Sequence, residues 1–427
     1  MSKFIIEGGR PLGGVVKPIG NKNAILKMIP ATLLTAEPVT FENVPAISDV
    51  TVMLGIMKEL GAKVDYRPET GRLTVHTPAV SAAGIEREAA QKMRASNMFL
   101  GPLLARQGQV TSFLPGGDKI GPREMTAHFD GLRQLGAKFR WLSFESFSLS
   151  GKLRGAEVFL YEPSVTATEN VLLAAVLAPG RTTITNAASE PHVQALCEML
   201  SVMGADIKGV GTNRLEIRGV AELRGATVPV PPDYVYVGTM IVLSAVTGGE
   251  LTVKDVRHED LKSILYFFRQ LGIRTQADGA DLVVPKRQRL TVENQAWART
   301  KGIYSQPWPC FPTDMMSLAI VLATQAKGAT LFFEKMYPGR MFFADYLNGM
   351  GANIIIADPH RVVVNGRTPL EGRPLQAPDL RAGMAYVTAG LAAAGRTTVE
   401  SVEHIDRGYP HLESTLQKLG AQITRSE

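Results

Sequence analysis

The chain has 427 residues, of which 45% are hydrophobic and 20% are charged, and its formal net charge is +6 at pH 7. This composition is typical of a soluble globular protein with at least two domains, and no apolar run approaches the roughly 18 residues that a membrane span needs. The positive charge is mild, and no cluster of lysine and arginine with interleaved aromatic residues marks a nucleic-acid surface. The charge balance favours recognition of small anions.

The number and spacing of the cysteines and histidines narrow the class of protein further. Cys197 and Cys310 are the only cysteines, too few for a disulfide framework and consistent with a reducing compartment. The seven histidines never occur at metal-ligand spacing, so we expect no metal site. The first residues, "MSKFIIEGGR", have one lysine before a short apolar stretch and do not resemble a secretory signal. We therefore expect a cytoplasmic protein.

A helical pattern that ends in glycine occurs six times along the chain. The glycines are Gly61, Gly136, Gly204, Gly272, Gly351 and Gly420. We expect each to take the left-handed conformation that ends a helix. A pair of alternating strands follows, as in residues 205–219, and Ser48 is the expected N-cap of the first of these helices.

A second, more apolar helix precedes each of these patterns, as in "VLLAAVLAPG" and "MSLAIVLATQ". Helices that are apolar on nearly every face are buried. The unit is therefore strand, buried helix, strand, amphipathic helix, strand, strand, which predicts an α/β fold. The sixth copy lacks a returning strand, and the lone N-terminal strand in "KFIIEGG" can supply it. We predict one domain at residues 22–231 and another at residues 1–21 plus 232–427, with domain closure across the two connections.

Polar residues gather where the buried helices begin. These ends carry Lys22 and Asn23, Arg94 and Ser96, Thr168 to Asn170, Gly238 and Thr239, Thr313 and Asp314, and Asp379 and Arg381. Helix N-termini attract anions, and arginine adds bidentate recognition of carboxylate or phosphate. Helix capping is the competing interpretation for Thr313, Asp314 and Asp379, but it does not explain the cations.

Other charges fall at matching places in the repeat. Arg340 and Arg407 are expected to begin the amphipathic helices of copies five and six. Asp118 and Arg123 occupy the equivalent stretch of copy two. Threefold packing of the repeats would gather these side chains around one anionic ligand site.

Seven stretches together resemble the enolpyruvyl transferases over essentially the whole chain. They are "GNKNA", "MRAS", "LPGGDKIGPR", "PSVTATEN", "FPTDM", "DLRAG" and "HIDRGY". The resemblance implies two inside-out α/β domains, each built from three βαβαββ repeats. It also implies transfer of the enolpyruvyl group of phosphoenolpyruvate to the 3-hydroxyl of UDP-N-acetylglucosamine, with release of phosphate, as the first committed step of peptidoglycan synthesis. The resemblance also implies that no metal or organic cofactor takes part. We expect neither a nucleic-acid nor a membrane partner, and the sequence does not specify an oligomeric state.

The resemblance assigns roles by position. Lys22, Arg123 and Arg407 are expected to hold phosphoenolpyruvate, and Asp314 is expected to take the proton of the acceptor's hydroxyl. Asp118 is expected to supply a proton to C3 of phosphoenolpyruvate. The remaining substrate-binding residues implied are Asn23, Arg94, Ser164, Val165, Arg340, Asp379 and Arg381.

Asp118 stands where most members of the family carry a cysteine and a minority carry aspartate. A carboxylic acid can deliver the proton if it is protonated when needed. Lys119 and Arg123 would lower its pKa, whereas bound phosphoenolpyruvate would raise it. Because alkylation by the epoxide fosfomycin requires a thiolate, the resemblance predicts resistance to that drug.

Several positions depart from the family pattern. They are Glu124, Thr126, Thr166, Tyr234, Tyr236 and Cys310. None of these positions is among the residues expected to hold phosphoenolpyruvate, so the alternatives concern the acceptor substrate. The chain could be a paralogue acting on another uridine nucleotide, or a catalytically silent UDP-sugar sensor. An EPSP synthase is disfavoured because its "NAGT" and "KSxS" stretches are missing.

Overall fold

The computed structural model describes residues 2–117, 120–293 and 301–427, which fall into two compact units. Unit 1 comprises Met1–Ile19, Lys119–Pro122 and Pro232–Glu427, and unit 2 comprises Gly20–Asp118 and Arg123–Pro231. The expected division placed residues 20–21 with unit 1 and residues 119–122 with unit 2, and its other bounds are the same. Ile120 belongs with unit 1 because its carbonyl accepts from Gly339 N at 3.0 Å.

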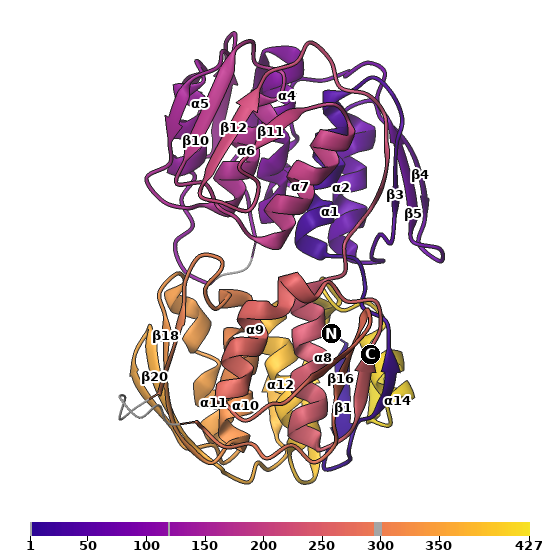
Figure 1. Cartoon of the computed structure of the whole chain (residues 1–427), viewed down its shortest axis with the longest axis vertical. Helices are drawn as coiled ribbons and strands as arrows, with labels where there is room; N and C mark the ends of the chain where they lie inside the picture. Colours follow the sequence, from indigo (N-terminus) through magenta and orange to yellow (C-terminus); the bar gives the residue numbers. More distant parts are fainter. Residues whose placement is uncertain (1, 118–119, 294–300) are drawn as a thin grey trace. The chain divides into compact units, whose positions relative to one another are not determined.

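Unit 2 contains the first three copies of the repeat (Figure 1). Copy one consists of α1 (Lys22–Ala31), η1 (Thr32–Leu34), β3 (Val39–Glu42), α2 (Ser48–Glu59), β4 (Lys63–Arg67) and β5 (Arg72–His76). Copy two consists of α3 (Arg87–Lys92), η2 (Arg94–Phe99), α4 (Leu100–Gln107), β6 (Gln109–Phe113), α5 (Thr126–Gln134), β7 (Lys138–Trp141) and β8 (Ser146–Ser150). Copy three consists of β9 (Glu157–Phe159), α6 (Val165–Ala175), β10 (Arg181–Thr185), α7 (Pro191–Val202), β11 (Asp206–Lys208) and β12 (Arg214–Arg218), and is followed by β13 (Thr227–Pro229).

Unit 1 contains the other three copies and the N-terminal strands β1 (Lys3–Glu7) and β2 (Gly14–Val16). Copy four consists of α8 (Tyr234–Thr247), β14 (Leu251–Val253), α9 (His258–Gln270), β15 (Gln276–Asp278) and β16 (Asp281–Val284). Copy five consists of β17 (Lys301–Ser305), η3 (Thr313–Met315), α10 (Met316–Gln325), β18 (Gly328–Glu334), η4 (Pro338–Met341), α11 (Ala344–Gly349), β19 (Ile354–Asp358) and β20 (Arg361–Gly366). Copy six consists of β21 (Pro374–Gln376), α12 (Leu380–Ala392), β22 (Arg396–Glu400), α13 (Glu403–Asp406), α14 (Leu412–Lys418) and β23 (Gln422–Ser426).

Each repeat builds one small sheet. In copy three, the buried helix α6 connects β9 to β10, and these two strands pair in parallel. Strands β12 and β11 extend the sheet, with β12 antiparallel to β10 and β11 antiparallel to β12. Parallel strands need such a crossover, whereas the last two strands need only a tight turn. Strand β13 completes the sheet of copy one, and β2 completes that of copy four. Copy two has a three-stranded sheet, with only a bridge between Gly84 and Thr111 at the parallel position.

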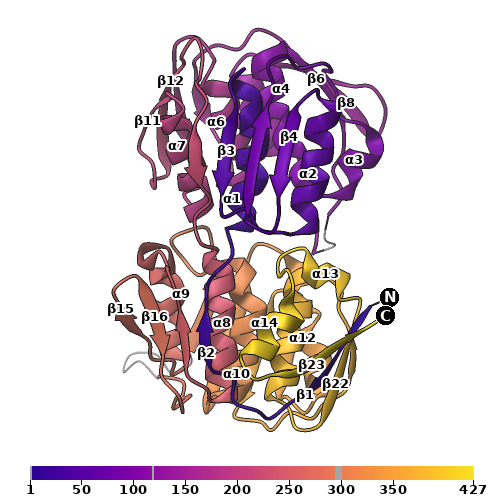
Figure 2. The same cartoon turned by 90° about the vertical axis from the view of Figure 1, so that its right-hand side faces the viewer.

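The two ends of the chain meet in one sheet, as the repeat count predicted. Strand β1 lies between β22 and β23 and is antiparallel to both, with Phe4 opposite Val399 and Arg425 (Figure 2). The sixth copy thus receives its last strand from the N-terminus.

The helix-ending glycines behave as predicted. All six have left-handed φ values, from 93° to 106°. Three local expectations were wrong. Ser48 is the first residue of α2 rather than its cap, which is Ile47. Arg340 lies in η4 and Arg407 follows α13, so neither begins a long amphipathic helix. Proline and glycine next to both arginines interrupt the helical hydrogen bonds and divide these segments into short pieces.

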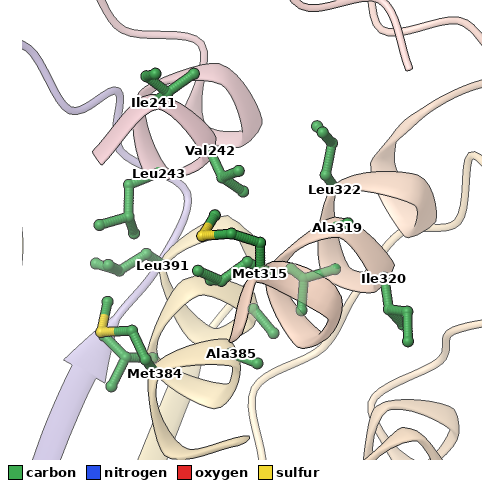
Figure 3. Close-up of a cluster of buried hydrophobic side chains, with 14 of the residues drawn as sticks. Ile241, Val242, Leu243, Met315, Ala319, Ile320, Leu322, Met384, Ala385 and Leu391 are labelled. Atoms are coloured by element: carbon green, nitrogen blue, oxygen red, sulfur yellow. The ribbon is translucent and has the colours of Figure 1, made fainter. Parts of the chain in front are cut away.

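Each unit has its own hydrophobic core, formed inside a ring of sheets by the buried helices. In unit 1 these helices are α8, α10 and α12 (Figures 1 and 3). Leu243, Ala319 and Ala385, one from each helix, are at most 1% exposed. Helices packed inside and sheets outside give the inside-out α/β arrangement that the sequence predicted. No helix in the described ranges combines the length and apolar character needed to span a membrane.

The core of unit 2 contains a fully buried carboxyl group. Glu169 of α6 is 0% exposed, and its Oε2 lies 3.7 Å from Nζ of Lys27 on α1. Burial raises the pKa of Glu169 to about 8, with Glu190 adding to the rise and Lys27 opposing it. Glu169 therefore carries a proton at neutral pH.

The folded-state pKa of Glu169 is above its value in an unfolded chain, so the native state binds the extra proton. The free energy of unfolding should fall as the pH rises from about 5 to about 8. The Glu169→Gln variant, which mimics the protonated acid, should lose this part of the decline. Urea midpoints at pH 5, 6, 7 and 8 measure it, with Glu222→Gln on the surface as control. Equal slopes in wild type and Glu169→Gln would contradict the prediction.

Candidate active site

Unit 1 contains a carboxylate held by two arginines. Asp314 in η3 accepts from Arg340 of η4 at 2.6 Å through Oδ1, and from Arg381 of α12 at 2.8 Å through Oδ2. The three side chains are only 11% to 21% exposed. The structure thus joins three residues that the sequence analysis had selected from separate motifs.

The two arginines control the protonation of Asp314. Burial alone would raise its pKa, but Arg381 and Arg340 outweigh that effect and hold the pKa well below the usual range. Asp314 is therefore ionised and, in this arrangement, a weak base. A ligand that drew the guanidinium groups toward itself would raise the pKa of Asp314.

A buried hydrogen-bond chain supports Arg381 from its other side. Thr239 donates to the carbonyl of Val235 at 2.8 Å, so Tyr409 must donate to Thr239, 2.7 Å away. The Tyr409 oxygen then accepts from Nη1 of Arg381 at 3.4 Å. Tyr409 is 1% exposed and stacks on Tyr236, with ring centroids 5.9 Å apart. The departure at Tyr236 is thus part of the packing behind the arginine.

Glu334 at the end of β18 is a site residue that the sequence analysis missed. Its carboxylate is fully buried and accepts from Ser305 and Thr313, both at 2.7 Å. It also accepts from the backbone N–H groups of Met336 at 2.8 Å and Tyr337 at 3.1 Å. One carboxylate therefore fixes both the segment that carries Asp314 and the turn that precedes Arg340. A glutamate at a strand end carries no sequence signal for such a role.

The capping interpretation holds for one of the acidic residues. Asp379 caps α12 by accepting from the N–H groups of Arg381 at 2.8 Å and Ala382 at 3.1 Å. Asp314 does not cap η3, whose N-cap is Pro312. Asp379 therefore sets the backbone from which the Arg381 side chain extends.

Two of the predicted residues open α1 in unit 2. Lys22 is the first residue of the helix and is 7% exposed, and its Nζ lies 2.8 Å from Oδ2 of Asp49 in α2. Asn23 follows it, and the helix is capped by Asn21, which accepts from Ala24 N at 3.0 Å. A cation at a helix start opposes the helix dipole, and here Asp49 offsets that cost.

The other predicted residues of unit 2 lie in copies two and three. Arg94 begins η2 and donates to the carbonyl of Glu124 at 2.9 Å, and the Glu124 carboxylate accepts from Thr126 at 3.1 Å. Two of the departures from the family pattern are therefore paired with each other. Ser164 caps α6 by accepting from Ala167 N at 3.4 Å, and Val165 is the first residue of that helix.

The structure describes the loop of copy two as far as Gly117 and again from Ile120. Asp118 and Lys119 themselves lie outside the described residues. Gly117 has a left-handed φ of 125°. A side chain on Gly116 would meet the carbonyl of Gln91 at 1.8 Å, so glycine is required there. The predicted Arg123 is partly exposed in unit 2, and Arg407 is partly exposed in unit 1 at the end of α13.

Nothing in the described ranges resembles a metal centre, because no three His, Cys, Asp or Glu side chains gather there as a metal ion would need.

Comparisons with known proteins place these features in a family context. The model of the family "EPSP synthase (3-phosphoshikimate 1-carboxyvinyltransferase)" matches residues 6–416. Proteins named UDP-N-acetylglucosamine 1-carboxyvinyltransferase are similar over the full length: that of Treponema pallidum is 46% identical, covering 99% of both chains, and that of Bradyrhizobium diazoefficiens is 45% identical, covering 99% of this chain and 98% of its own.

Solved structures share the fold. The enolpyruvyl transferase NikO from Streptomyces tendae matches with a TM-score of 0.89 at 24% identity, over 100% of this chain and 99% of its own. An EPSP synthase from Acinetobacter baumannii matches with a TM-score of 0.77 at 21% identity, over 100% of both chains.

Proposed function

The chain belongs to the EPSP synthase family and, within it, to the UDP-N-acetylglucosamine 1-carboxyvinyltransferases, and from that premise we propose that it transfers the enolpyruvyl group of phosphoenolpyruvate to the 3-hydroxyl of UDP-N-acetylglucosamine. The observation that carries the proposal is the Asp314, Arg340 and Arg381 cluster, which combines an acid–base group with cations for an anionic substrate. The reaction is the first committed step of peptidoglycan synthesis, and we assign it to the cytoplasm.

The proposed chemistry is an addition followed by an elimination. The acceptor oxygen bonds to C2 of phosphoenolpyruvate while its proton passes to Asp314, and Asp118 delivers a proton to C3. Phosphate then leaves C2 of the tetrahedral intermediate as a proton passes from C3 back to Asp118, which restores the double bond, and the proton held by Asp314 passes to the departing phosphate. Atoms balance: the products are the enolpyruvyl ether and inorganic phosphate.

Substrate binding would convert Asp314 into a competent base. Phosphoenolpyruvate brings a carboxylate and a phosphate that compete for the guanidinium groups of Arg340 and Arg381. Each contact that moves from Asp314 to the substrate raises the pKa of Asp314 toward the value that proton transfer requires. The base would then act only in the loaded site, which limits side reactions.

The remaining cations would stabilise charge that builds up during the reaction. Lys22 and Arg123 of unit 2, like Arg381 and Arg407 of unit 1, are assigned to phosphoenolpyruvate as part of the proposal. Fixed cations offset the repulsion between two anionic substrates and stabilise the developing phosphate dianion. Asn23, Arg94, Ser164 and Val165 are assigned to the UDP-sugar, and Asp379 supports Arg381.

A substrate screen tests the proposal. Phosphoenolpyruvate is held constant, and phosphate release is measured with UDP-N-acetylglucosamine, UMP and shikimate 3-phosphate. We expect release with UDP-N-acetylglucosamine and none with shikimate 3-phosphate. Release with UMP alone would assign the chain to a paralogue with another uridine nucleotide as acceptor, and no release with any of them would favour a silent UDP-sugar sensor.

Fosfomycin sensitivity tests the chemistry at Asp118. The drug alkylates a thiolate, and a carboxylate is a far weaker nucleophile, so the wild-type enzyme should keep its activity after incubation with the drug. The Asp118→Cys variant should become sensitive and gain the mass of one drug molecule. Intact-protein mass spectrometry and residual phosphate release measure both effects. A wild-type adduct on residue 118 would refute the prediction.

A further inference from the structure

Thr166, one of the departures from the family pattern, is the second residue of α6 and is partly exposed. Its Oγ1 lies 3.0 Å from Nε2 of His128 on α5. His128 is 1% exposed, and its other ring nitrogen, Nδ1, lies 3.0 Å from Nδ2 of Asn170. The three side chains form a chain of contacts from the core of unit 2 to its surface.

The direction of each proton in this chain follows from Asn170. Its Oδ1 accepts from the backbone N–H of Gly101 at 2.9 Å, which identifies the other amide atom as nitrogen. That nitrogen donates to the carbonyl of Asn97 at 3.0 Å and, with its second proton, to Nδ1 of His128. Because an amide nitrogen does not accept, Nδ1 carries no proton, and the neutral imidazole must carry its proton on Nε2.

His128 stays neutral at physiological pH. Burial, with a smaller effect from Arg94, lowers the pKa of His128 to about 3. The Nε2 proton is therefore permanently present, and it is donated to Thr166 Oγ1. The side-chain amide of Asn97 lies farther from Nε2, at 3.5 Å, than Thr166 Oγ1 does, at 3.0 Å.

The hydroxyl proton of Thr166 is consequently directed away from His128. In the part of the chain that the structure describes, the contact with His128 is the only hydrogen bond of this hydroxyl. The hydroxyl is therefore available as a donor to a group other than His128, and it lies next to the segment of Ser164 and Val165 that is assigned to the UDP-sugar. The backbone N–H groups of Val165 and Thr166 belong to the first turn of α6, so the helix itself offers them no acceptor.

We propose that Thr166 is a specificity-determining residue whose hydroxyl donates a hydrogen bond to a phosphate oxygen of the nucleotide acceptor, with His128 and Asn170 orienting it. The inference rests on the proposed function, because that function places the acceptor at this helix. Ionised phosphate oxygens are strong acceptors, and a side chain already restrained by His128 loses less conformational freedom when it binds them. The role adds a side-chain contact where the family pattern has glycine.

Calorimetric titration with UDP and with uridine tests the contact without requiring turnover. The Thr166→Val variant keeps the shape and loses the donor, whereas Thr166→Ser keeps the donor. We expect the Kd of UDP to rise roughly tenfold in Thr166→Val and to stay near the wild-type value in Thr166→Ser, as befits one hydrogen bond to a charged group. The Kd of uridine should not change. Thr227→Val, an exposed strand position in the same unit, is the control.

Three results would overturn the inference: a UDP Kd in Thr166→Val equal to that of wild type, an equal weakening of uridine, or a wild-type protein that does not bind UDP. Thermal unfolding shows whether the variants keep their fold. The proposed function is judged separately by phosphate release from the wild type. UDP binding that depends on Thr166 without any turnover would refute the function and leave the inference standing.

Discussion

Replacing Asp314 with asparagine should lower kcat by a factor of roughly 10² to 10⁴, the usual range for loss of a general base. Asparagine has nearly the same shape but cannot take the proton of the acceptor's hydroxyl. It also removes the charge that competes with phosphoenolpyruvate for Arg340 and Arg381. The KM of phosphoenolpyruvate should therefore stay constant or fall while kcat drops.

Steady-state phosphate release with each substrate varied in turn separates the two effects. Asp345→Asn on the exposed face of α11 is the matched control and should behave as wild type. Thermal unfolding should be recorded for both variants, because Asp314→Asn leaves two buried guanidinium groups without their anion. A kcat within threefold of wild type would remove Asp314 from the role of base.

Replacing Glu334 with alanine should destabilise the protein by about 3 to 5 kcal/mol, because several buried donors lose their common acceptor. The acceptor would be lost to the hydroxyl groups of Ser305 and Thr313 and to the backbone N–H groups of Met336 and Tyr337. The kcat should fall by more than the loss of folded protein explains, because Glu334 holds the segments that position Asp314 and Arg340.

Denaturant unfolding and kcat measured well below the unfolding transition test this prediction. Glu371→Ala, an exposed glutamate of the same unit, is the matched control. The Glu334→Gln variant keeps one carbonyl oxygen and should show an intermediate loss of stability. If Glu334→Ala unfolds at the same denaturant concentration as Glu371→Ala and turns over normally, Glu334 does not position the site.

Periodic patterns of neighbouring residues predicted most of the fold. Helix-ending glycines such as Gly61 and Gly204, apolar helices and alternating hairpins are local signals, and local backbone preference is enough to produce them. The sixfold repeat made them reliable, because the same reading had to hold in every copy. The pairing of β1 with β23 followed from a missing strand in copy six.

Local patterns failed where one residue had two comparable options. Ser48 has the side chain of a cap but begins α2, because the backbone at Ile47 already provides the extended residue before the helix. Arg340 and Arg407 sit beside proline and glycine, which break the helices that the repeat predicted. Cap and break positions depend on one or two hydrogen bonds, and nearby packing readily changes them.

The sequence alone determined the repeat, the inside-out α/β class and the family to which the chain belongs, because each rests on residue patterns that recur or match along the chain. Only the tertiary structure decided how the site residues act on one another. Glu334 with Thr313, Arg381 with Tyr409, and Thr166 with His128 lie 21 to 38 residues apart and carry no shared spacing signal. The proton directions in these contacts, and the lowered pKa values of His128 and Asp314, arise from burial and from contacts between segments, which exist only once the chain has folded.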